Sequence, residues 1–247
     1  MLFTKRAAGD TLYLKSRLSQ HASRTVILGD FMNCDDIKGV IFDLDGTLLD
    51  SMHVWDKVDI DFLARRGMAL PDGYQKVITS MSYTEAAIYT KELFGFEETV
   101  EQIVAEWHAT VYDEYAHSLK LKPGAKDYLN ILSEKGIKVA LATGSDQQLY
   151  EPTLRNNGVY GLFDVFVTLS DVTRSKVFPD IYLKAAEKLC LEPAGCLVFE
   201  DIIEGIRSAK AAGMKAVGVY DSSSAADRGE IELIADGFIM DFTQLLR

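Results

Sequence analysis

Cysteine and long apolar runs are scarce in this sequence of 247 residues. Its cysteines, Cys34, Cys190 and Cys196, are odd in number and lack close metal-ligand spacing, so we expect neither a disulfide framework nor a zinc site. No apolar run is long enough to cross a bilayer, and the N-terminus lacks the continuous apolar core of a secretory signal. These absences predict a cytoplasmic protein without a membrane partner.

Net positive charge is also lacking. The formal charge is −11 and the isoelectric point is about 4.9, whereas binding of phosphate backbones requires a basic surface. We therefore expect no nucleic-acid partner, although a small local phosphate site is allowed. Apolar residues make up 48% of the chain, which is enough for the core of one large domain or of a domain with an insertion.

The first 31 residues differ from the rest because basic side chains outnumber acidic ones there. One interpretation is a transit peptide, since such segments are basic and contain serine. The other is an extension that the fold does not need, upstream of a translation start at Met32. We favour the second interpretation and expect residues 1–36 to form an N-terminal extension.

Short apolar runs alternate with longer amphipathic ones after this extension. The short runs are rich in β-branched and aromatic residues and predict strands at 39–43, 137–142, 163–167, 196–199 and 216–219. The longer run at 123–136 opens with Pro123 and closes on Gly136, which is typical of a helix. This alternation predicts an α/β fold: a Rossmann-like parallel sheet with helices on both faces and ligands at the carboxyl ends of its strands.

One long stretch, residues 52–119, contains no strand-like run. Its apolar residues recur at helical spacing, with breaks near 71–73 and 94–96. The stretch predicts an α-helical cap domain inserted after the first strand. The α/β core is then expected to comprise residues 37–51 and 120–247.

Two acids follow the first predicted strand in the segment VIFDLDGTLLDS, residues 40–51. Asp43 and Asp45 are two residues apart, so in extended backbone both side chains point to the same side. Gly46 allows a turn, and Asp50 or Ser51 can cap the following helix. A solvated loop would also explain one acid, but paired carboxylates at a buried strand end favour a divalent-cation site.

Three further segments lie at strand ends or helix starts. AlaThrGlySer at 142–145 combines a hydroxyl with exposed N–H groups and is typical of an anion cradle. Lys176 precedes a helix that begins with Pro179, where an ammonium group can neutralise an anion, although a single lysine is usually solvated surface. GluAsp at 200–201 repeats the pattern of acids after an apolar strand. Together these segments predict a site for a metal ion and a phosphate group.

In this order, the four segments resemble the motifs of the haloacid dehalogenase superfamily. AspLeuAspGlyThr at 43–47 resembles the first motif, Thr143 the second, Lys176 the third and the acids at 200–201 the fourth. The stretch at 200–214 and the helical insertion are similar to the branch with an inserted helical cap, which includes β-phosphoglucomutase and many small-molecule phosphatases. The resemblance extends from about residue 37 to the end of the chain.

This resemblance implies a chemistry for the acids. Asp43 is expected to be the nucleophile that becomes an aspartyl phosphate, and Asp45 the acid and base that exchanges a proton with the leaving and attacking oxygens. Asp43, the backbone carbonyl of Asp45, and Asp201 are expected to hold Mg²⁺, with Glu200 as an added or outer ligand. Mg²⁺ is thus the expected cofactor.

The same resemblance assigns the phosphate. Thr143, the N–H of Gly144 and Lys176 are expected to hold the transferring phosphoryl oxygens. Ser175 and Val177 stand where the family usually has Gly and Pro around the lysine, so the geometry of this loop is open. We predict a Mg²⁺-dependent phosphatase of small phosphorylated metabolites, among which sugar phosphates are candidates, and we expect it to be a monomer.

The alternative within the family is a sugar-phosphate mutase. The mutase carries a histidine twelve residues after its nucleophile, where this chain has Trp55, and His53 is out of register. Tyr83 stands about where the mutase has a phosphate-gripping arginine. Both departures favour hydrolysis. A non-enzymatic regulator on the same fold ranks lower, because Asp43 and Asp45 are both retained.

Other side chains of the predicted cap have simpler interpretations. Spacing predicts that the aromatic residues belong to the core rather than stack on a substrate: Trp55, Phe62, Trp107 and Tyr112. The acids near the start of the cap are expected to form a solvated face: Asp56, Asp59 and Asp61. Neither group identifies the substrate.

Overall fold

A computed structural model describes residues 36–246 of the chain. The predicted N-terminal extension lies outside the described residues except for Asp36, which is in a turn. None of the helices in the described part of the chain is both long and apolar enough to span a bilayer. The two cysteines in this part, Cys190 and Cys196, are free.

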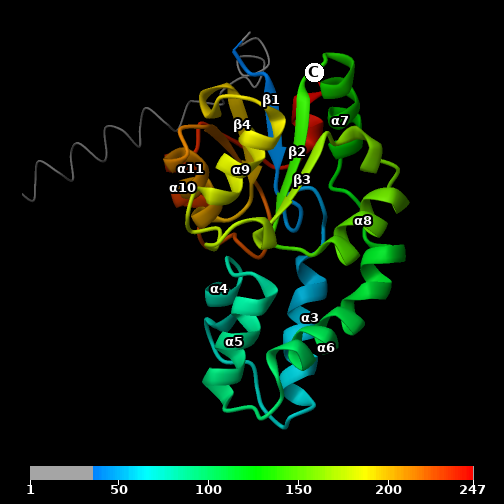
Figure 1. Ribbon diagram of the computed structural model, residues 1–247, viewed down its shortest axis with the longest axis vertical. Coiled ribbons are helices and arrows are strands. Elements are labelled where there is room, and N and C mark those ends of the chain that lie inside the picture. The colour runs from blue at the N-terminus through cyan, green and yellow to red at the C-terminus, as the bar shows by residue number, and fades with distance from the viewer. Residues whose placement is uncertain (1–35, 247) are drawn as a thin grey trace, which may run out of the picture. The chain divides into compact units, whose positions relative to one another are not determined.

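The core of the fold is a six-stranded sheet in which all neighbouring strands are parallel, in the order β3-β2-β1-β4-β5-β6 (Figure 1). The strands are β1 Gly39–Phe42, β2 Lys138–Thr143, β3 Val165–Thr168, β4 Cys196–Glu200, β5 Lys215–Val219 and β6 Gly237–Ile239. The first five lie within two residues of their predicted positions. The edge strand β6 was not predicted, because only three residues form it and one of them is glycine.

Alternate residues of the central strand β1 face two different helical layers. Ile41 belongs to a buried cluster with side chains from α9 (Asp180–Leu189) and α10 (Ile203–Ala211). On the other face the ring of Phe42 lies 6.2 Å from that of Tyr128, in α7 (Ala125–Glu134), and 5.9 Å from that of Phe242. The predicted Rossmann-like α/β fold with helices on both faces is confirmed.

Two further α-helices and four short helices complete the core in the described part of the chain. They are α8 Gln147–Asn156, α11 Arg228–Ile234, and the short 3₁₀ helices η2 Tyr160–Leu162, η3 Leu169–Asp171, η4 Pro193–Gly195 and η5 Phe242–Leu245.

Between β1 and β2 the chain forms helices and no strand. These helices are α3 Met52–Ala64, α4 Tyr74–Ile78, α5 Tyr83–Phe94, α6 Val100–Asp113 and the π-helix η1 Glu114–Ser118. Capping boxes define the starts of α5 and α6: Ser82 pairs with Glu85, and Thr99 with Gln102. We call residues 52–118 the inserted helices; the predicted domain boundaries at 51/52 and 119/120 stay a prediction.

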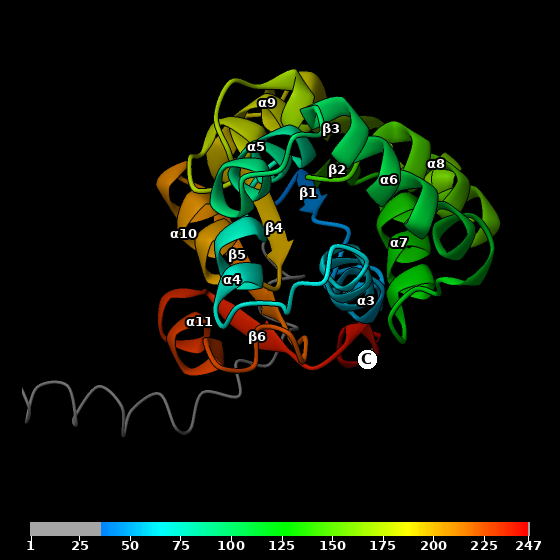
Figure 2. The same cartoon turned by 90° about the horizontal axis from the view of Figure 1, so that it is seen from below.

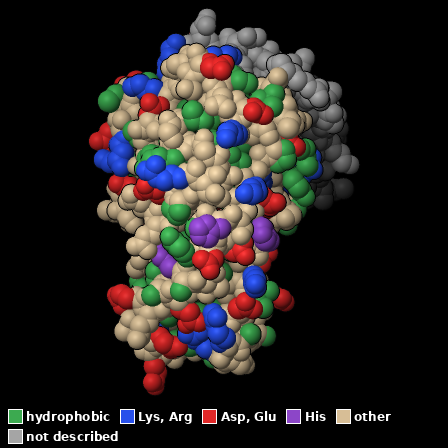
Figure 3. Space-filling model, turned by 90° about the vertical axis from the view of Figure 1, so that its right-hand side faces the viewer, with side chains coloured by type: hydrophobic (Ala, Val, Ile, Leu, Met, Phe, Trp, Pro, Cys, Tyr) green, Lys and Arg blue, Asp and Glu red, His purple; other side chains and the backbone are tan. Residues whose placement is uncertain are grey.

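All six strands end at the same edge of the sheet. In Figure 1 the arrow of β1 points toward the inserted helices, and Figure 2 shows the molecule from their side. The carboxyl edge of the sheet therefore faces the inserted helices, which is where parallel α/β folds bind ligands. On the face shown in Figure 3, basic and acidic side chains are interspersed.

Two glycines near opposite ends of α7 have similar backbone angles. Together they test how closely the C-terminal segment of the chain packs against the start of this helix. Gly124 has φ +77° and a Cβ there would lie 2.5 Å from the backbone N of Thr243, whereas Gly136 has φ +66° and open space around it. We expect Gly136→Ala to lower the free energy of unfolding by about 1 kcal/mol through left-handed strain alone. Gly124→Ala should lower the free energy of unfolding by about 2 kcal/mol more than Gly136→Ala does, because the new methyl group collides with the backbone of Thr243. Urea unfolding of both variants measures the difference, and equal losses would contradict the packing.

Candidate active site

Asp43 directly follows β1, and its carboxylate lies at the carboxyl edge of the sheet with an exposed fraction of 4%. The ammonium group of Lys176 donates a hydrogen bond to Asp43 Oδ1. Lys176 is equally buried, so this ion pair is shielded from water. Although Ser175 and Val177 flank it, Lys176 lies beside Asp43 in the pocket; its predicted contact with the phosphate stays a prediction.

Glu200, the last residue of β4, holds the other side of this ammonium group. Its Oε1 accepts hydrogen bonds from Lys176 Nζ at 2.7 Å and from the Tyr182 hydroxyl at 2.9 Å. Its Oε2 accepts a hydrogen bond from the backbone N–H of Ile202 at 3.0 Å. Because both oxygens have protein partners, Glu200 orients Lys176, and its capacity for a metal ion is smaller than that of its neighbour Asp201.

Asp201 has one satisfied and one unsatisfied oxygen. Thr47 Oγ1 donates to its Oδ1 at 2.7 Å, while its Oδ2 is buried and has no hydrogen-bond partner among residues 36–246. A side chain at Gly46, where φ is +79°, would collide with this carboxylate, so glycine is required both for the turn and for the close approach. A buried carboxylate oxygen without a partner is costly and needs a positive group.

The donor set fits a magnesium ion. Oxygen atoms of Asp43, Glu200 and Asp201 all lie within 4.8 Å of one another, and carboxylate oxygen is the ligand that Mg²⁺ prefers. Burial raises the pKa of Asp43 to about 7 despite the opposing charge of Lys176, and the charge of Glu200 adds to the rise. Burial and then the charges of Glu200 and Asp43 raise the pKa of Asp201 well above its usual value. The ammonium groups of Lys176, beside Asp43, and of Lys122, which acts on Asp201, do not offset the burial, so these carboxylates are short of positive charge.

Burial by itself would lower the pKa of Lys176. The charges of Asp43 and Glu200, together with their hydrogen bonds, outweigh this effect and raise the pKa above its usual value. Lys176 therefore stays protonated at neutral pH and carries a positive charge into the site.

The predicted phosphate cradle lies at the end of β2. Thr143 is buried, and its Oγ1 accepts a hydrogen bond from the backbone N–H of Ser145 at 2.9 Å. Thr143, Gly144 and Ser145 line the same pocket as Asp43 and Lys176. The structure thus brings together all the residues predicted for the metal ion and the phosphate.

Asp45 has surroundings unlike those of Asp43, because hydroxyl groups rather than charges contact it. Its Oδ1 accepts hydrogen bonds from Ser51 Oγ at 2.7 Å and from the Tyr115 hydroxyl. Its Oδ2 accepts one from Ser145 Oγ at 2.6 Å. Ser51 occupies the N-cap position of α3, but its hydroxyl contacts Asp45 instead of capping the helix.

These hydroxyl groups were missed as site residues. Ser145 belongs to the segment at 142–145 that was predicted as an anion cradle. Tyr115 is 70 residues from Asp45 in sequence and lies in no recognisable motif. Trp55 Nε1 donates to the Tyr115 hydroxyl at 2.6 Å, so the position compared with the mutase histidine is linked to Asp45 through Tyr115.

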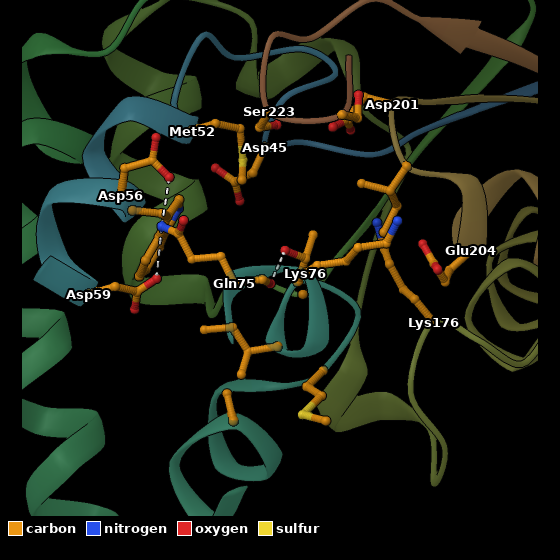
Figure 4. A pocket seen from close by; sticks show the side chains of 18 of the residues that line it. Asp45, Met52, Asp56, Asp59, Gln75, Lys76, Lys176, Asp201, Glu204 and Ser223 are labelled. Atoms are coloured by element: carbon orange, nitrogen blue, oxygen red, sulfur yellow. Dashed lines mark hydrogen bonds between the residues drawn. The ribbon is translucent and has the colours of Figure 1, made fainter. Parts of the chain in front are cut away.

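The pocket has a volume of about 570 Å³ and lies between the sheet edge and the inserted helices (Figure 4). The sheet side contributes Asp43, Asp45, Lys176 and other residues, and the inserted side contributes Asp56, Asp59, Gln75 and Lys76 among others. Backbone contact joins the two sides, since the N–H of Lys176 donates to the carbonyl of Ser80 at 3.2 Å.

Three expectations for the inserted helices need correction. Asp59 is not part of a solvated face: it is buried, because α3 turns it toward the pocket, where Gln75 Nε2 donates to its Oδ2 at 3.3 Å. Tyr112 is not a core residue, since 47% of its surface is exposed. Trp55 is only partly buried and lines the pocket. Phe62 and Trp107 are buried as predicted.

Comparisons with known proteins agree with this architecture. The family model described as haloacid dehalogenase-like hydrolase matches residues 37–213. The chain is 34% identical over 182 residues to YhcW of Bacillus subtilis (strain 168), covering 73% of this chain and 82% of that protein. It is 29% identical over 187 residues to hexitol phosphatase B of Escherichia coli (strain K12), with the same coverage.

A solved structure shows the same fold. β-Phosphoglucomutase from Clostridium difficile superimposes with a TM-score of 0.73 at 22% identity, covering 85% of this chain and 93% of the other. At this identity the likeness concerns the fold alone. Because the family match covers well over half of the residues, the chain belongs to the haloacid dehalogenase-like hydrolases, and its predicted assignment as a phosphoric monoester hydrolase of this family is confirmed.

Proposed function

We propose that the protein is a Mg²⁺-dependent phosphatase of small phosphorylated metabolites that acts through an aspartyl phosphate on Asp43. The observation that carries this proposal is the convergence of Asp43, Lys176 and Asp201 in one pocket, with Asp45 beside them and held by hydroxyl groups. The arrangement supplies a nucleophile, a fixed cation, metal ligands and a separate proton carrier.

In the first half-reaction, a carboxylate oxygen of Asp43 attacks the phosphorus atom. The bond between phosphorus and the alcohol oxygen breaks, and that oxygen takes a proton from Asp45. In the second half-reaction Asp45 takes a proton from water as the water oxygen attacks phosphorus. The bond between phosphorus and Asp43 then breaks, which releases inorganic phosphate and restores the free carboxylate.

Charge neutralisation makes the first attack possible, since a phosphomonoester dianion repels a carboxylate. Lys176, Thr143 and the N–H of Gly144 would hold the phosphoryl oxygens in line with Asp43. Asp43, Asp201 and the backbone carbonyl of Asp45 would hold Mg²⁺, with Glu200 as an outer ligand. The ion would neutralise negative charge on the phosphoryl group when bound.

Hydrolysis is favoured over mutase chemistry. In a mutase a sugar hydroxyl, instead of water, must accept the phosphoryl group from the enzyme. By the resemblance, a mutase carries a histidine twelve residues after its nucleophile. Here Trp55 occupies that position and donates its N–H to Tyr115.

We infer that the enzyme is cytoplasmic. That it is a monomer stays a prediction.

The residues that the inserted helices contribute to the pocket indicate which chemical groups the substrate carries besides its phosphate. Gln75 Nε2 donates to Asp56 Oδ1 at 2.7 Å and also to Asp59, so two carboxylates face the region opposite Lys176 (Figure 4). Among the described residues that line the pocket, the cations are Lys176 and Lys76, and Lys76 is paired with Asp227 at 2.9 Å. A second anionic group would meet like charge here, whereas hydroxyl groups would find acceptors. This favours sugar or polyol monophosphates, and a relative is named a hexitol phosphatase.

The nucleophile is tested by Asp43→Asn. The amide cannot form the phosphoryl ester, so turnover of 4-nitrophenyl phosphate with Mg²⁺ should fall by about 10³-fold or more. Asp50→Asn is the matched control, because Asp50 lies in the same loop but is exposed, and it should retain most activity. Normal turnover by Asp43→Asn would refute the mechanism.

The metal site is tested by Asp201→Asn in thermal melts with EDTA or MgCl₂. Free Mg²⁺ at 100 times its dissociation constant should stabilise the native protein by about 2.7 kcal/mol, and the variant should lose most of this gain. Without Mg²⁺ the variant should be no less stable than the native protein, because it loses a buried charge that Glu200 and Asp43 repel. An unchanged response to MgCl₂ would place the ion elsewhere, and Asp50→Asn again serves as the control.

Substrate choice is tested by Asp59→Asn, with Asp61→Asn on the same helix as the control. Burial raises the pKa of Asp59 to about 7, against the opposing hydrogen bond from Gln75. The amide replaces one acceptor oxygen by an NH₂ donor and removes the negative charge, so kcat/KM for sorbitol 6-phosphate should fall by about 10-fold, while fructose 1,6-bisphosphate is hydrolysed relatively better. If both variants keep the native preference, the acids do not select the substrate.

A further inference from the structure

Tyr115 connects the inserted helices to the proposed proton carrier. It lies in η1, where the chain returns from the inserted helices to the sheet, and its side chain is fully buried. Its hydroxyl contacts Asp45 Oδ1. A buried tyrosine hydroxyl requires a hydrogen-bond partner, and in this position the partner is the carboxylate beside the nucleophile.

The direction of this hydrogen bond follows from Trp55. An indole N–H can only donate, so the bond from Trp55 Nε1 to the Tyr115 oxygen, at 2.6 Å, uses the tyrosine oxygen as an acceptor. The hydroxyl proton of Tyr115 is then directed to Asp45. The three residues form a donor chain in one direction, from Trp55 through Tyr115 to Asp45, and hydrogen bonds in such a chain polarise one another.

The two carboxylate oxygens of Asp45 have different hydrogen-bond donors in this arrangement. Oδ1 accepts from Tyr115 and from Ser51, whereas Oδ2 accepts, among the described residues, from Ser145 alone, a member of the predicted phosphate cradle. Two donors on Oδ1 lock the carboxyl orientation and leave Oδ2 on the side of the cradle. Oδ2 is therefore the oxygen available to exchange a proton with the substrate.

The groups that hold Asp45 come from the two ends of the insertion. Ser51 immediately precedes α3, the first of the inserted helices, and Tyr115 lies in η1, the last of them. The backbone carbonyl of Tyr115 accepts a hydrogen bond from Thr153 Oγ1 in α8 at 2.6 Å, which anchors η1 to the core. Trp55 itself belongs to α3, so a shift of α3 relative to η1 would break the donor chain.

We propose that Tyr115, oriented by Trp55, is a positioning residue that fixes the Asp45 carboxyl group for proton transfer to the leaving oxygen. The proposal rests on the phosphatase function argued above. It assigns to the inserted helices a part in the chemistry itself, because the acid is correctly oriented only while α3 and η1 are packed together.

The test compares two substrates of similar size with different need for a proton. Benzyl phosphate releases an alkoxide that requires protonation, whereas 4-nitrophenyl phosphate releases a phenolate that does not. The ratio of their kcat/KM values reports the steps up to release of the alcohol, so it is independent of hydrolysis of the phosphoenzyme. General acid catalysis contributes at least about 10²-fold, and Tyr115→Phe should lower the ratio of benzyl to nitrophenyl phosphate by about 10- to 100-fold.

Two further variants make the assignment specific. Trp55→Phe should shift the ratio in the same direction by about 3- to 10-fold and should have no further effect in the Tyr115→Phe background, because both act through one hydrogen-bond chain. Tyr74→Phe is the matched control: it removes another buried tyrosine hydroxyl, bonded to Thr90 at 2.6 Å, and should leave the ratio unchanged.

The outcomes separate this proposal from the proposed function. If the native enzyme hydrolyses neither substrate and no other phosphomonoester, the function is wrong. If it hydrolyses both but Tyr115→Phe lowers both kcat/KM values equally, or changes neither, the positioning role is overturned. Circular dichroism melts establish that each variant is folded. If Tyr115→Phe does not fold, Trp55→Phe decides the question, because it retains the tyrosine.

Discussion

The ammonium group of Lys176, held between Asp43 and Glu200, is the interaction on which the site depends. It forms ion pairs with two of the three clustered buried carboxylates, and the Oδ2 of the third, Asp201, has no hydrogen-bond partner in the described part of the chain. A buried ion pair of this kind adds little to stability, because desolvation of the charges offsets their attraction. Its contribution to the proposed function is electrostatic: the residual negative charge would attract a divalent cation, and the fixed ammonium group would be a partner for an incoming phosphate.

Two carboxylates that are two residues apart in sequence are suited to different tasks because their surroundings differ. Asp43 is surrounded by charged groups: it is paired with Lys176, while burial and the nearby charge of Glu200 raise its pKa to about 7, so a bound cation would favour its ionised form. Asp45 is surrounded by the hydroxyl groups of Ser51, Tyr115 and Ser145, which donate hydrogen bonds to its two oxygens and carry no charge. Separate environments for neighbouring acids are a general means of assigning nucleophile and proton carrier.

The sequence allowed the sheet to be predicted well, since buried parallel strands are short apolar runs that stand out between amphipathic helices. The residues near the sheet edge were also predicted, because each follows a strand in a recognisable segment. Asp59 and Tyr112 were misjudged for a common reason. Helical spacing shows which residues share a face of a helix, but not whether that face meets a pocket, the core or solvent, and this depends on how α3 and α6 pack.

By itself, the sequence determined the fold class and the family. It also determined which polar side chains follow the strands or begin the helices, because strand ends and motifs are local sequence patterns. These side chains are Asp43, Asp45, Thr143, Lys176, Glu200 and Asp201. Only the tertiary structure decided that Glu200 orients Lys176, that Asp59 faces the pocket and that Tyr115 contacts Asp45. These contacts join segments as many as 70 residues apart, and no periodicity or spacing encodes them. They arise when the inserted helices pack against the carboxyl edge of the sheet.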